Sequence, residues 1–196
     1  MATTTLLLGP NDHGRVLSLD DYLDAEVESG YRYELARGVL EVTEIPNDPH
    51  GFTVSEILIA LGDYAQAHRE LIFRIGGGAE FRFIIPSLIS GRHPDVAVAL
   101  WSTPKDKRGR RAASFAVEVV SKGSKKRDYV AKREEYLAYG LLEYWIVDPT
   151  LKQVTVLVRE GDAWVEQVVV GDGSAESTVL PGFVVPIAGL WTDEDD

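Results

Sequence analysis

The 196-residue sequence contains no cysteine, which excludes disulfide bonds, zinc–thiolate sites and thiol nucleophiles. It also lacks long apolar runs, because no stretch approaches the ~20 residues that a membrane-spanning helix needs. The N-terminus has a run of three leucines but no basic leader, which argues against a signal peptide. We therefore expect a soluble, cytoplasmic protein. With 45% hydrophobic residues, the chain can bury one substantial core as a single domain.

Two common catalytic motifs are also absent. No serine lies in a nucleophile-elbow sequence, which argues against a serine hydrolase. The GGG at residues 76–78 lacks the lysine and the spacing of a phosphate-binding loop, so we interpret it as a turn. The sequence shows no repeat, no low-complexity segment and no linker.

The sequence does contain two carboxylates within apolar segments. Asp95 lies in HPDVAVAL (residues 93–100) and Glu118 in SFAVEVV (residues 114–120), and each segment is typical of a short buried strand. An unpaired carboxylate in an apolar interior costs several kcal/mol, so each must find a cation, a metal or a proton. One interpretation is two separate salt bridges at the strand ends.

The neighbours of these carboxylates favour a shared site. Strand alternation places Asp95 on one face with Ala97 and Ala99, and Glu118 on one face with Ala116 and Val120. Small neighbours leave room for a ligand between the two acids. Oxygen-only ligation suits Mg²⁺ or Mn²⁺, and we expect carboxyl groups about 4–6 Å apart that share one ion.

A predicted helix follows Glu118, with Ser124 as a plausible N-cap and Gly140 as the C′ residue. Tyr129, Lys132, Tyr136 and Tyr139 share one face of this helix, at spacings of three, four and three residues. Lys132 therefore belongs to a tyrosine stripe. It either carries out chemistry there or packs its stem while its ammonium group reaches water.

The net charge of −11 at first argues against a nucleic-acid partner. However, residues 104–133 hold 11 Lys+Arg and 3 Asp+Glu, an excess of 8, whereas the rest of the chain has a deficit of 19. Phosphate-ester chemistry requires cations for the polyanion and carboxylates for the metal. We therefore expect the basic run KDKRGRR (residues 105–111) to lie beside the acidic site and to bind phosphates. The alternative is a solvated loop.

The remaining patterns indicate an α+β fold with a mixed central β-sheet flanked by helices and additional β-hairpins. The expected elements are a helix at residues 19–28 capped by Ser18, a hairpin or bent strand at 31–42, a helix from 47 to about 69, a glycine-turned hairpin at 71–86, a strand at 142–149 stopped by proline, and a hairpin through Gly161 and Asp162.

Taken together, these segments resemble a known family. PDVAV, AVEVVS and RDYVAKREEYLAYGLLEYWIVDP are similar to the Uma-type putative restriction endonucleases, a branch of the PD-(D/E)XK nuclease superfamily. YELARGVLEV, NDPHG and LPGFVVPIAGLW also resemble that family. The resemblance covers residues 18–191, taken as a single endonuclease-like domain, with an N-terminal extension (1–17) and an acidic tail (192–196) that we expect to fray. It implies a restriction-endonuclease-like core with a metal-dependent nuclease site at one edge.

The resemblance assigns roles residue by residue. Asp95 corresponds to the aspartate of the PD motif, Glu118 to the acid of the second motif, and Glu34 to the glutamate of the N-terminal segment. The backbone carbonyl of Val119 is implied as a further metal ligand.

One position departs from the pattern, because Val120 stands where the superfamily has its usual lysine. A cation is still needed near the attacking water. Lys132 resembles the lysine that this branch supplies from the helix. Lys122 is the competitor, although the sequence around it is typical of a loop.

The histidines are less informative. His93 is expected to share the face of Asp95, and His50 matches the family's histidine near the second helix, but a lone histidine is more often structural.

Two functions remain open. One is a metal-dependent DNA endonuclease, which requires Glu34, Asp95, Glu118 and Lys132 to converge. The other is a catalytically inactive nuclease-fold protein that binds nucleic acid or a protein partner. We further expect a homodimer through an apolar patch that includes Trp145, Trp164 and Val168.

Overall fold

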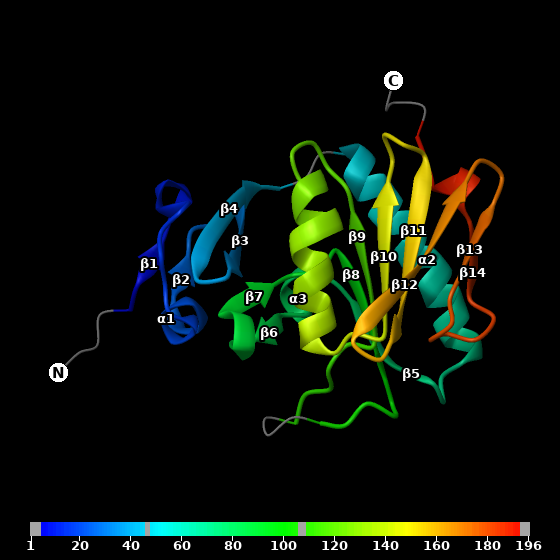
Figure 1. Ribbon diagram of the computed structural model, residues 1–196, viewed down its shortest axis with the longest axis horizontal. Coiled ribbons are helices and arrows are strands. Elements are labelled where there is room, and N and C mark those ends of the chain that lie inside the picture. The colour runs from blue at the N-terminus through cyan, green and yellow to red at the C-terminus, as the bar shows by residue number, and fades with distance from the viewer. Residues whose placement is uncertain (1–4, 46–47, 106–108, 193–196) are drawn as a thin grey trace.

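The computed structural model describes residues 5–45, 48–105 and 109–192, and it contains two main β-sheets and few helices (Figure 1). The larger sheet has six strands in the order β12-β11-β10-β9-β8-β5. These are β5 (Ile72–Gly76), β8 (Val96–Leu100), β9 (Phe115–Val119), β10 (Glu143–Asp148), β11 (Gln153–Glu160) and β12 (Ala163–Val170). β9 and β10 are parallel and the other neighbours are antiparallel, so the predicted mixed central sheet is confirmed.

The smaller antiparallel sheet has four strands in the order β4-β3-β7-β6. These are β3 (Tyr31–Ala36), β4 (Val39–Glu44), β6 (Phe83–Ile85) and β7 (Ser90–Arg92). Helix α1 (Leu19–Asp24) and the short parallel pair β1 (Leu7–Leu8) and β2 (Glu26–Val27) lie beside it. This small lobe has its own apolar cluster, which includes Leu8, Leu35 and Leu40.

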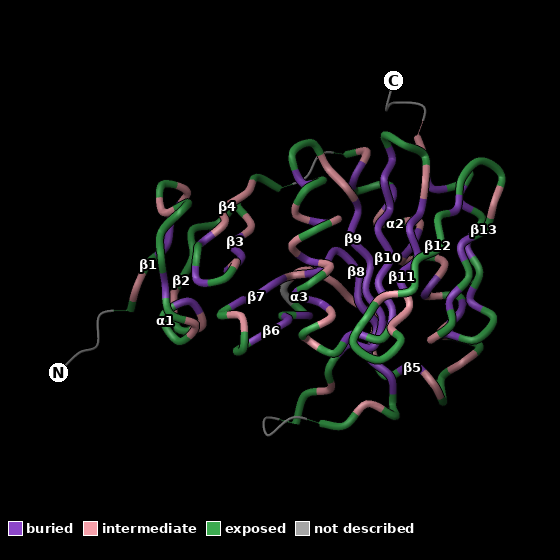
Figure 2. Tube along the Cα trace, in the orientation of Figure 1, coloured by how far each residue is buried: buried purple, intermediate pink, exposed green. Residues whose placement is uncertain are grey.

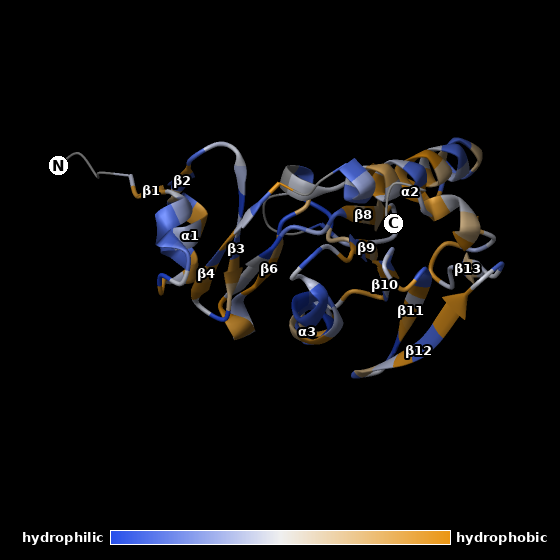
Figure 3. Cartoon of the chain, turned by 90° about the horizontal axis from the view of Figure 1, so that it is seen from above, coloured by the Kyte–Doolittle hydropathy of each residue, from blue (hydrophilic) through white to orange (hydrophobic). Residues whose placement is uncertain are grey.

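Helices cover both faces of the larger sheet, as the view from above shows (Figure 3). Helix α2 (Asp48–Ala67) lies on one face with β13 (Ser174–Glu176) and β14 (Val184–Pro186). The opposite face is covered by α3 (Lys132–Tyr139), which continues a π-helical segment (Arg127–Ala131). Strand alternation sends Val96 and Val117 toward α2, and Ala97 and Ala116 toward α3. The central strands β8–β10 are therefore buried on both faces (Figure 2).

Short 3₁₀ turns complete the fold, at Pro10–Asp12, Gly78–Glu80, Pro86–Leu88 and Ile187–Leu190. In the part of the chain that the structure describes, no helix is long and apolar enough to span a bilayer.

Several local predictions are confirmed. The Ser18 hydroxyl accepts the backbone N–H of Asp21 at 3.0 Å and caps α1, although this helix ends at Asp24 because β2 follows. The hairpin around Arg37 and Gly38 forms as β3 and β4. The helix expected from residue 47 to about 69 forms as α2, which faces the core through buried Ile57 and Leu61.

The predicted hairpin over residues 71–86 is wrong. β5 pairs with β8 in the larger sheet, whereas β6 pairs with β7 in the smaller one. Gly77 explains the difference, because a Cβ at this position would lie 1.9 Å from the Asp95 carbonyl oxygen. The chain thus crosses tightly over the start of β8 from one sheet to the other, and the Gly78 N–H donates to the Pro94 carbonyl at 2.8 Å.

The structure describes most of the expected N-terminal extension but little of the expected acidic tail. Residues 5–17, expected as an extension, pack onto the small lobe through buried Leu8 and Leu17. The acids of the expected tail, residues 193–196, lie outside the described residues, as does Asn47 at the expected start of the second helix.

Candidate active site

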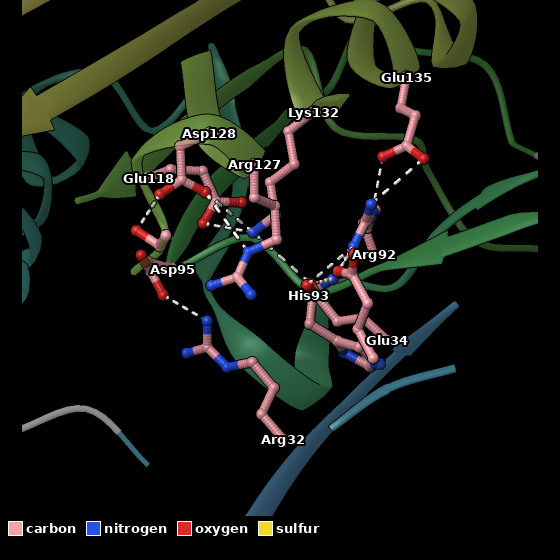
Figure 4. Close-up of polar contacts among 12 residues, drawn as sticks. Arg32, Glu34, Arg92, His93, Asp95, Glu118, Arg127, Asp128, Lys132 and Glu135 are labelled. Carbon is pink, nitrogen blue, oxygen red and sulfur yellow. Dashed lines mark hydrogen bonds and ion pairs between the residues drawn. The ribbon is translucent and has the colours of Figure 1, made fainter. Parts of the chain in front are cut away.

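Asp95 and Glu118 lie side by side on the face of the larger sheet that α3 covers. Val96 pairs with Val117 and Ala97 with Ala116, so extending this antiparallel register by one residue sets Asp95 opposite Glu118. Directly opposite residues have Cβ atoms about 4.5–5.5 Å apart. The Val119 N–H also donates to Asp95 Oδ2 at 2.9 Å, which ties the start of β8 to the end of β9. The two carboxylates therefore share one site (Figure 4).

Lys132 reaches this pair from α3. Its Nζ lies 2.8 Å from Glu118 Oε2, 3.6 Å from Glu34 Oε1 and 3.7 Å from Asp128 Oδ1. The side chain is 1% exposed, so it does not snorkel to water. Tyr136, one helical turn further, donates its hydroxyl to Glu118 Oε1. The helix face predicted from the tyrosine stripe thus supplies two contacts to one carboxylate.

The close packing of charges gives Glu118 and Glu34 very different pKa values. Burial raises the pKa of Glu118 to about 8; Lys132 opposes this rise, while the charges of Asp95, Asp128 and Glu34 add to it. Burial also acts on Glu34, but Lys132 and Arg92 outweigh it and lower that pKa to about 2. Buried, clustered acids are expected to include at least one with a raised pKa, and in this cluster that acid is Glu118.

Asp95 is held in its ionised form by partners from other elements. Arg32 of β3 donates from Nη1 to Oδ1 at 2.7 Å, and His50 Nε2 lies 3.1 Å from Oδ2. Burial alone would raise the pKa of Asp95, but the His50 hydrogen bond and the Arg32 charge hold it well below its usual range. Both oxygens of Asp95 are therefore engaged.

Glu34 belongs to a second buried network behind the first. The fully buried Arg92 donates from Nε to Glu135 Oε2 at 2.6 Å, and its Nη1 lies 2.5 Å from Glu41 Oε2 and 3.3 Å from Glu34 Oε2. Glu34 also contacts Lys132 and accepts the His93 N–H at 2.7 Å. Glu34 thus bridges a buried arginine and a buried lysine, and it links the small sheet to α3.

A cavity of about 550 Å³ opens onto Asp95 and Glu118. Its other charged or titratable lining residues are His13, Arg32, Glu44, His50, Lys122, Arg127 and Asp128. Glu34 and Lys132 are not among the lining residues and lie behind the two carboxylates. The cavity thus presents the two acids to a ligand, with basic side chains around them.

Of the four residues that the endonuclease hypothesis requires, Lys132 pairs directly with Glu34 and Glu118, and Asp95 lies opposite Glu118 on the neighbouring strand. Of two further residues considered from the sequence, His93 differs from its expected place and Lys122 agrees with it. His93 lies elsewhere: Nδ1 is 2.9 Å from the Gly78 carbonyl and Nε2 is 3.3 Å from the Tyr22 hydroxyl. Lys122 follows the end of β9 in a turn, as its sequence indicated, and it lines the cavity without contacting Glu118.

Sequence reasoning missed several charged members of the cluster, including Arg32, Arg92 and Asp128. Arg32 lies two residues before Glu34, and strand alternation gives both the same face. Asp128 lies four residues before Lys132 on the same helical stretch, where a carboxylate and a lysine are neighbours. The two-residue strand spacing of Arg32 and the four-residue helix spacing of Asp128 could therefore have indicated both residues.

The described residues of the basic run, 105 and 109–111, do not lie beside the carboxylates, so this prediction is wrong for them. Residues 101–114 join the end of β8 to the start of β9, whereas Asp95 and Glu118 stand at the opposite ends of these strands (Figure 1). Of the run, Lys105, Arg110 and Arg111 line a separate cavity, and residues 106–108 lie outside the described residues. A loop that joins two strands lies at one end of the strand pair, and here the carboxylates lie at the other end.

The expected apolar dimer patch also needs a correction. Trp145 is fully buried, and its ring stacks against Phe183, because β10 lies in the middle of the larger sheet. Val168 remains 48% exposed on the edge strand β12.

The donor set at the cavity suits a hard cation. Asp95, Glu118 and the Val119 carbonyl offer oxygen atoms only, which Mg²⁺ and Mn²⁺ prefer. Among the described residues, no group of three His, Asp or Glu side chains is arranged to hold an ion. An ion held between the two carboxylates would therefore need further oxygen ligands, and Val119 lines the same cavity.

Comparisons with known proteins agree with this architecture. A solved structure of a protein from Anabaena variabilis ATCC 29413, described as a putative nuclease belonging to DUF820, matches with a TM-score of 0.68 and 18% identity, over 89% of this chain and 97% of that one. This likeness supports the fold. No curated protein shows significant similarity to the chain. The model of the Uma2 family, described as "Putative restriction endonuclease", matches residues 19–188. The chain therefore belongs to the Uma2 family.

Proposed function

We propose that this protein is a metal-dependent DNA endonuclease that hydrolyses phosphodiester bonds. The observation that carries the proposal is the placement of two opposed strand carboxylates, Asp95 and Glu118, at the wall of one cavity, with the buried ammonium of Lys132 directly behind Glu118. The family description and the nuclease named among the solved structures point in the same direction.

Each residue has a physical role in this proposal. Asp95, Glu118 and the Val119 carbonyl would hold Mg²⁺ or Mn²⁺, and the bound ion would lower the pKa of a water molecule and polarise the phosphate. Lys132 stabilises the ionised form of Glu118 and places a positive charge beside the point where negative charge develops. Glu34 holds Lys132 in place from behind and is itself paired with Arg92. Lys122 and Arg127, at the cavity wall, are suited to bind phosphate oxygens.

The test is cleavage of supercoiled plasmid DNA with Mg²⁺, with Mn²⁺ and with EDTA. We expect nicked or linear product with either metal, none with EDTA, and none from Asp95→Asn. Lys152→Gln serves as the control, because Lys152 is exposed in the turn between β10 and β11. Equal cleavage by the wild type and by Asp95→Asn would refute the proposal.

One observation favours the second candidate, an inactive nuclease-fold protein that binds nucleic acid. Both oxygens of Asp95 are engaged by Arg32, His50 and the Val119 N–H, so an ion must displace or share these partners. A protein that binds DNA but cleaves neither DNA nor RNA with either metal would support this candidate.

We also propose a homodimer, because cleavage of both strands of a duplex calls for two sites. Support comes from the edge strand β12, where Val165, Val168 and Val170 are exposed. Light scattering at micromolar concentration tests it, and a mass of 21.6 kDa would indicate a monomer.

A further inference from the structure

A second cavity, of about 380 Å³, lies at the far end of the β8–β9 pair from the carboxylates. Its charged lining comprises five basic residues and one acid, although the whole chain carries a net charge of −11. The basic residues are Arg74, Arg82, Lys105, Arg110 and Arg111, and the acid is Glu80. Such a local reversal of charge creates a positive field that attracts polyanions.

Two arginines of this cavity, Arg74 and Arg111, pack against aromatic rings. The Arg74 guanidinium lies 4.1 Å from the centre of the Phe81 ring. Arg111 lies 5.3 Å from the Phe73 ring and 5.5 Å from the Trp101 ring. The Nε atoms of Arg74 and Arg111 are buried and have no hydrogen-bond partner among the described residues. Buried donors of this kind are normally satisfied, so an acceptor is expected.

Two further cations of this cavity, Arg82 and Lys105, are accessible to an anionic ligand. Arg82 and Lys105 are exposed and form no ion pair with any described residue. Arg82 lies 5.3 Å from the Tyr22 ring, and Lys105 is joined to Arg111 by an isolated β-bridge. Phosphate groups, which carry several acceptor oxygens, match both the charge and the unpaired donors.

An exposed aromatic pair stands next to these cations. Trp101 is 49% exposed and Phe73 is 38% exposed, and their rings meet edge to face at 4.8 Å. The indole N–H of Trp101 donates to the Arg69 carbonyl at 3.1 Å, which fixes the ring in place. Fixed, exposed aromatic rings beside a basic groove are the arrangement on which bases of single-stranded nucleic acid stack.

We propose that this region, which we call the distal phosphate site, binds a nucleic-acid strand, with phosphates held by Arg74, Arg82 and Lys105 and a base stacked on Trp101. The choice of ligand rests on the proposed nucleic-acid substrate, but binding here needs no catalysis.

The distance between the two cavities can be estimated along the helical stretch from Arg127 to Tyr139, because Arg127 lines the first cavity and Tyr139 lines the second. Twelve residues at a rise of 1.5 Å separate these cavities by about 18 Å. In duplex form this distance corresponds to about five base pairs.

The distal phosphate site is tested by binding in EDTA, so that no cleavage interferes. The probe is a fluorescein-labelled single-stranded oligothymidylate, with the Asp95→Asn protein as the parent. We expect Arg82→Gln/Lys105→Gln to weaken binding roughly tenfold at moderate salt and to reduce the slope of log K against log salt by about 1.4, since two phosphate contacts are lost. A control of equal charge change, Arg15→Gln/Lys152→Gln, alters exposed residues outside both cavities and should bind within about twofold of the parent.

Tryptophan fluorescence gives a second readout. We expect the oligonucleotide to quench emission in the parent and most of this quenching to disappear in Trp101→Phe, because Trp145 is buried and the other two tryptophans are partly buried. Free nucleoside triphosphate, titrated in parallel, distinguishes the two sources of phosphate. If it binds as tightly as the oligonucleotide and depends equally on Arg82 and Lys105, the site takes free nucleotides.

The proposal is overturned if neither probe depends on Arg82 and Lys105, or if all binding is lost in Lys122→Gln/Lys126→Gln, which alters the first cavity and its flank. These outcomes are separate from a failure of cleavage. A protein that never cuts DNA can still bind it at the distal phosphate site, and an active endonuclease can still lack this site.

Discussion

Lys132 Nζ lies 2.8 Å from Glu118 Oε2, although the lysine comes from α3 and the glutamate from β9. In the superfamily pattern that the chain resembles, the lysine follows the acid by two residues on the same strand. Here that position is Val120, which packs against the apolar cluster under α3. The ammonium group therefore reaches Glu118 from the helix above the sheet. A lysine still lies beside the carboxylate, although Val120 replaces the usual lysine of the strand.

Replacing Lys132 with methionine should abolish cleavage and destabilise the fold. The substitution leaves Glu34, Glu118 and Asp128 buried without their shared cation, and removal of one partner from a buried ion pair costs about 3–5 kcal/mol. Loss of the charge next to the reaction should lower the cleavage rate about 100-fold or more. Urea denaturation and plasmid cleavage measure the two effects.

Lys122→Gln is the matched comparison for this variant. Lys122 is exposed at the same cavity but does not contact Glu118, so its loss should leave the free energy of unfolding unchanged within about 0.5 kcal/mol. A cleavage rate that falls further in Lys122→Gln than in Lys132→Met would identify Lys122 as the catalytic cation instead.

Glu118 should make the metal-free protein less stable as the pH rises. Its pKa is about 8 in the folded protein against an ordinary value of 4.5, so between these values the folded state binds a proton that the unfolded state has lost. The stabilisation is fully present below about 4.5 and is lost as the pH rises through about 8. Glu34 stays ionised over this window, because its pKa is about 2.

The measurement compares the free energy of unfolding of the wild type and Glu118→Gln from pH 5 to pH 8.5 in EDTA. Glutamine does not titrate, so the wild type should lose stability relative to the variant across this range. A difference that is independent of pH would show that Glu118 titrates normally in the folded protein.

Much of the site could be predicted from the sequence because its signals are local. An acid in an apolar strand, such as Asp95 or Glu118, conflicts with its surroundings, and strand alternation then fixes its face. Lys132 is visible because helical spacing places it with Tyr136. The fold class follows in the same way from alternating and helical patterns.

Relationships between distant segments could not be predicted in this way. β5 pairs with β8 and not with β6 because the chain at Gly77 passes tightly over the backbone of Asp95. Residues distant in sequence make this contact, so the pattern around β5 does not reveal it. Lys105 and Arg110, from the basic run, follow one site strand and precede the other, but strand direction carries them to the end of the sheet opposite the carboxylates. The burial of Trp145 likewise depends on which strands flank β10.

Removing Arg32 should tighten metal binding. Its guanidinium lies 2.7 Å from Asp95 Oδ1 and occupies an oxygen that an ion would use. Arg32→Gln removes the competing charge and leaves His50 in place, so we expect Mn²⁺ to bind several-fold more tightly by calorimetry, because the guanidinium no longer competes with the ion for Asp95 or repels it. Arg133→Gln is the control, because Arg133 pairs with Glu166 on β12 instead. Weaker Mn²⁺ binding by Arg32→Gln would mean that Arg32 supports the metal site.

Gly77→Ala should be the most damaging small substitution near the site. An added Cβ would meet the Asp95 carbonyl oxygen at 1.9 Å and its carbon at 2.8 Å, and backbone atoms at the start of β8 cannot move aside without shifting the Asp95 carboxylate. We expect a loss of about 2–4 kcal/mol in the free energy of unfolding, together with weaker Mn²⁺ binding. Gly62→Ala is the matched control: it lies inside α2 with no atom within 4 Å of the new Cβ, so it should stabilise the protein by about 0.5–1 kcal/mol. If both variants gain stability, β5 does not cross over β8 at Gly77, and the placement of Asp95 argued from that crossing fails with it.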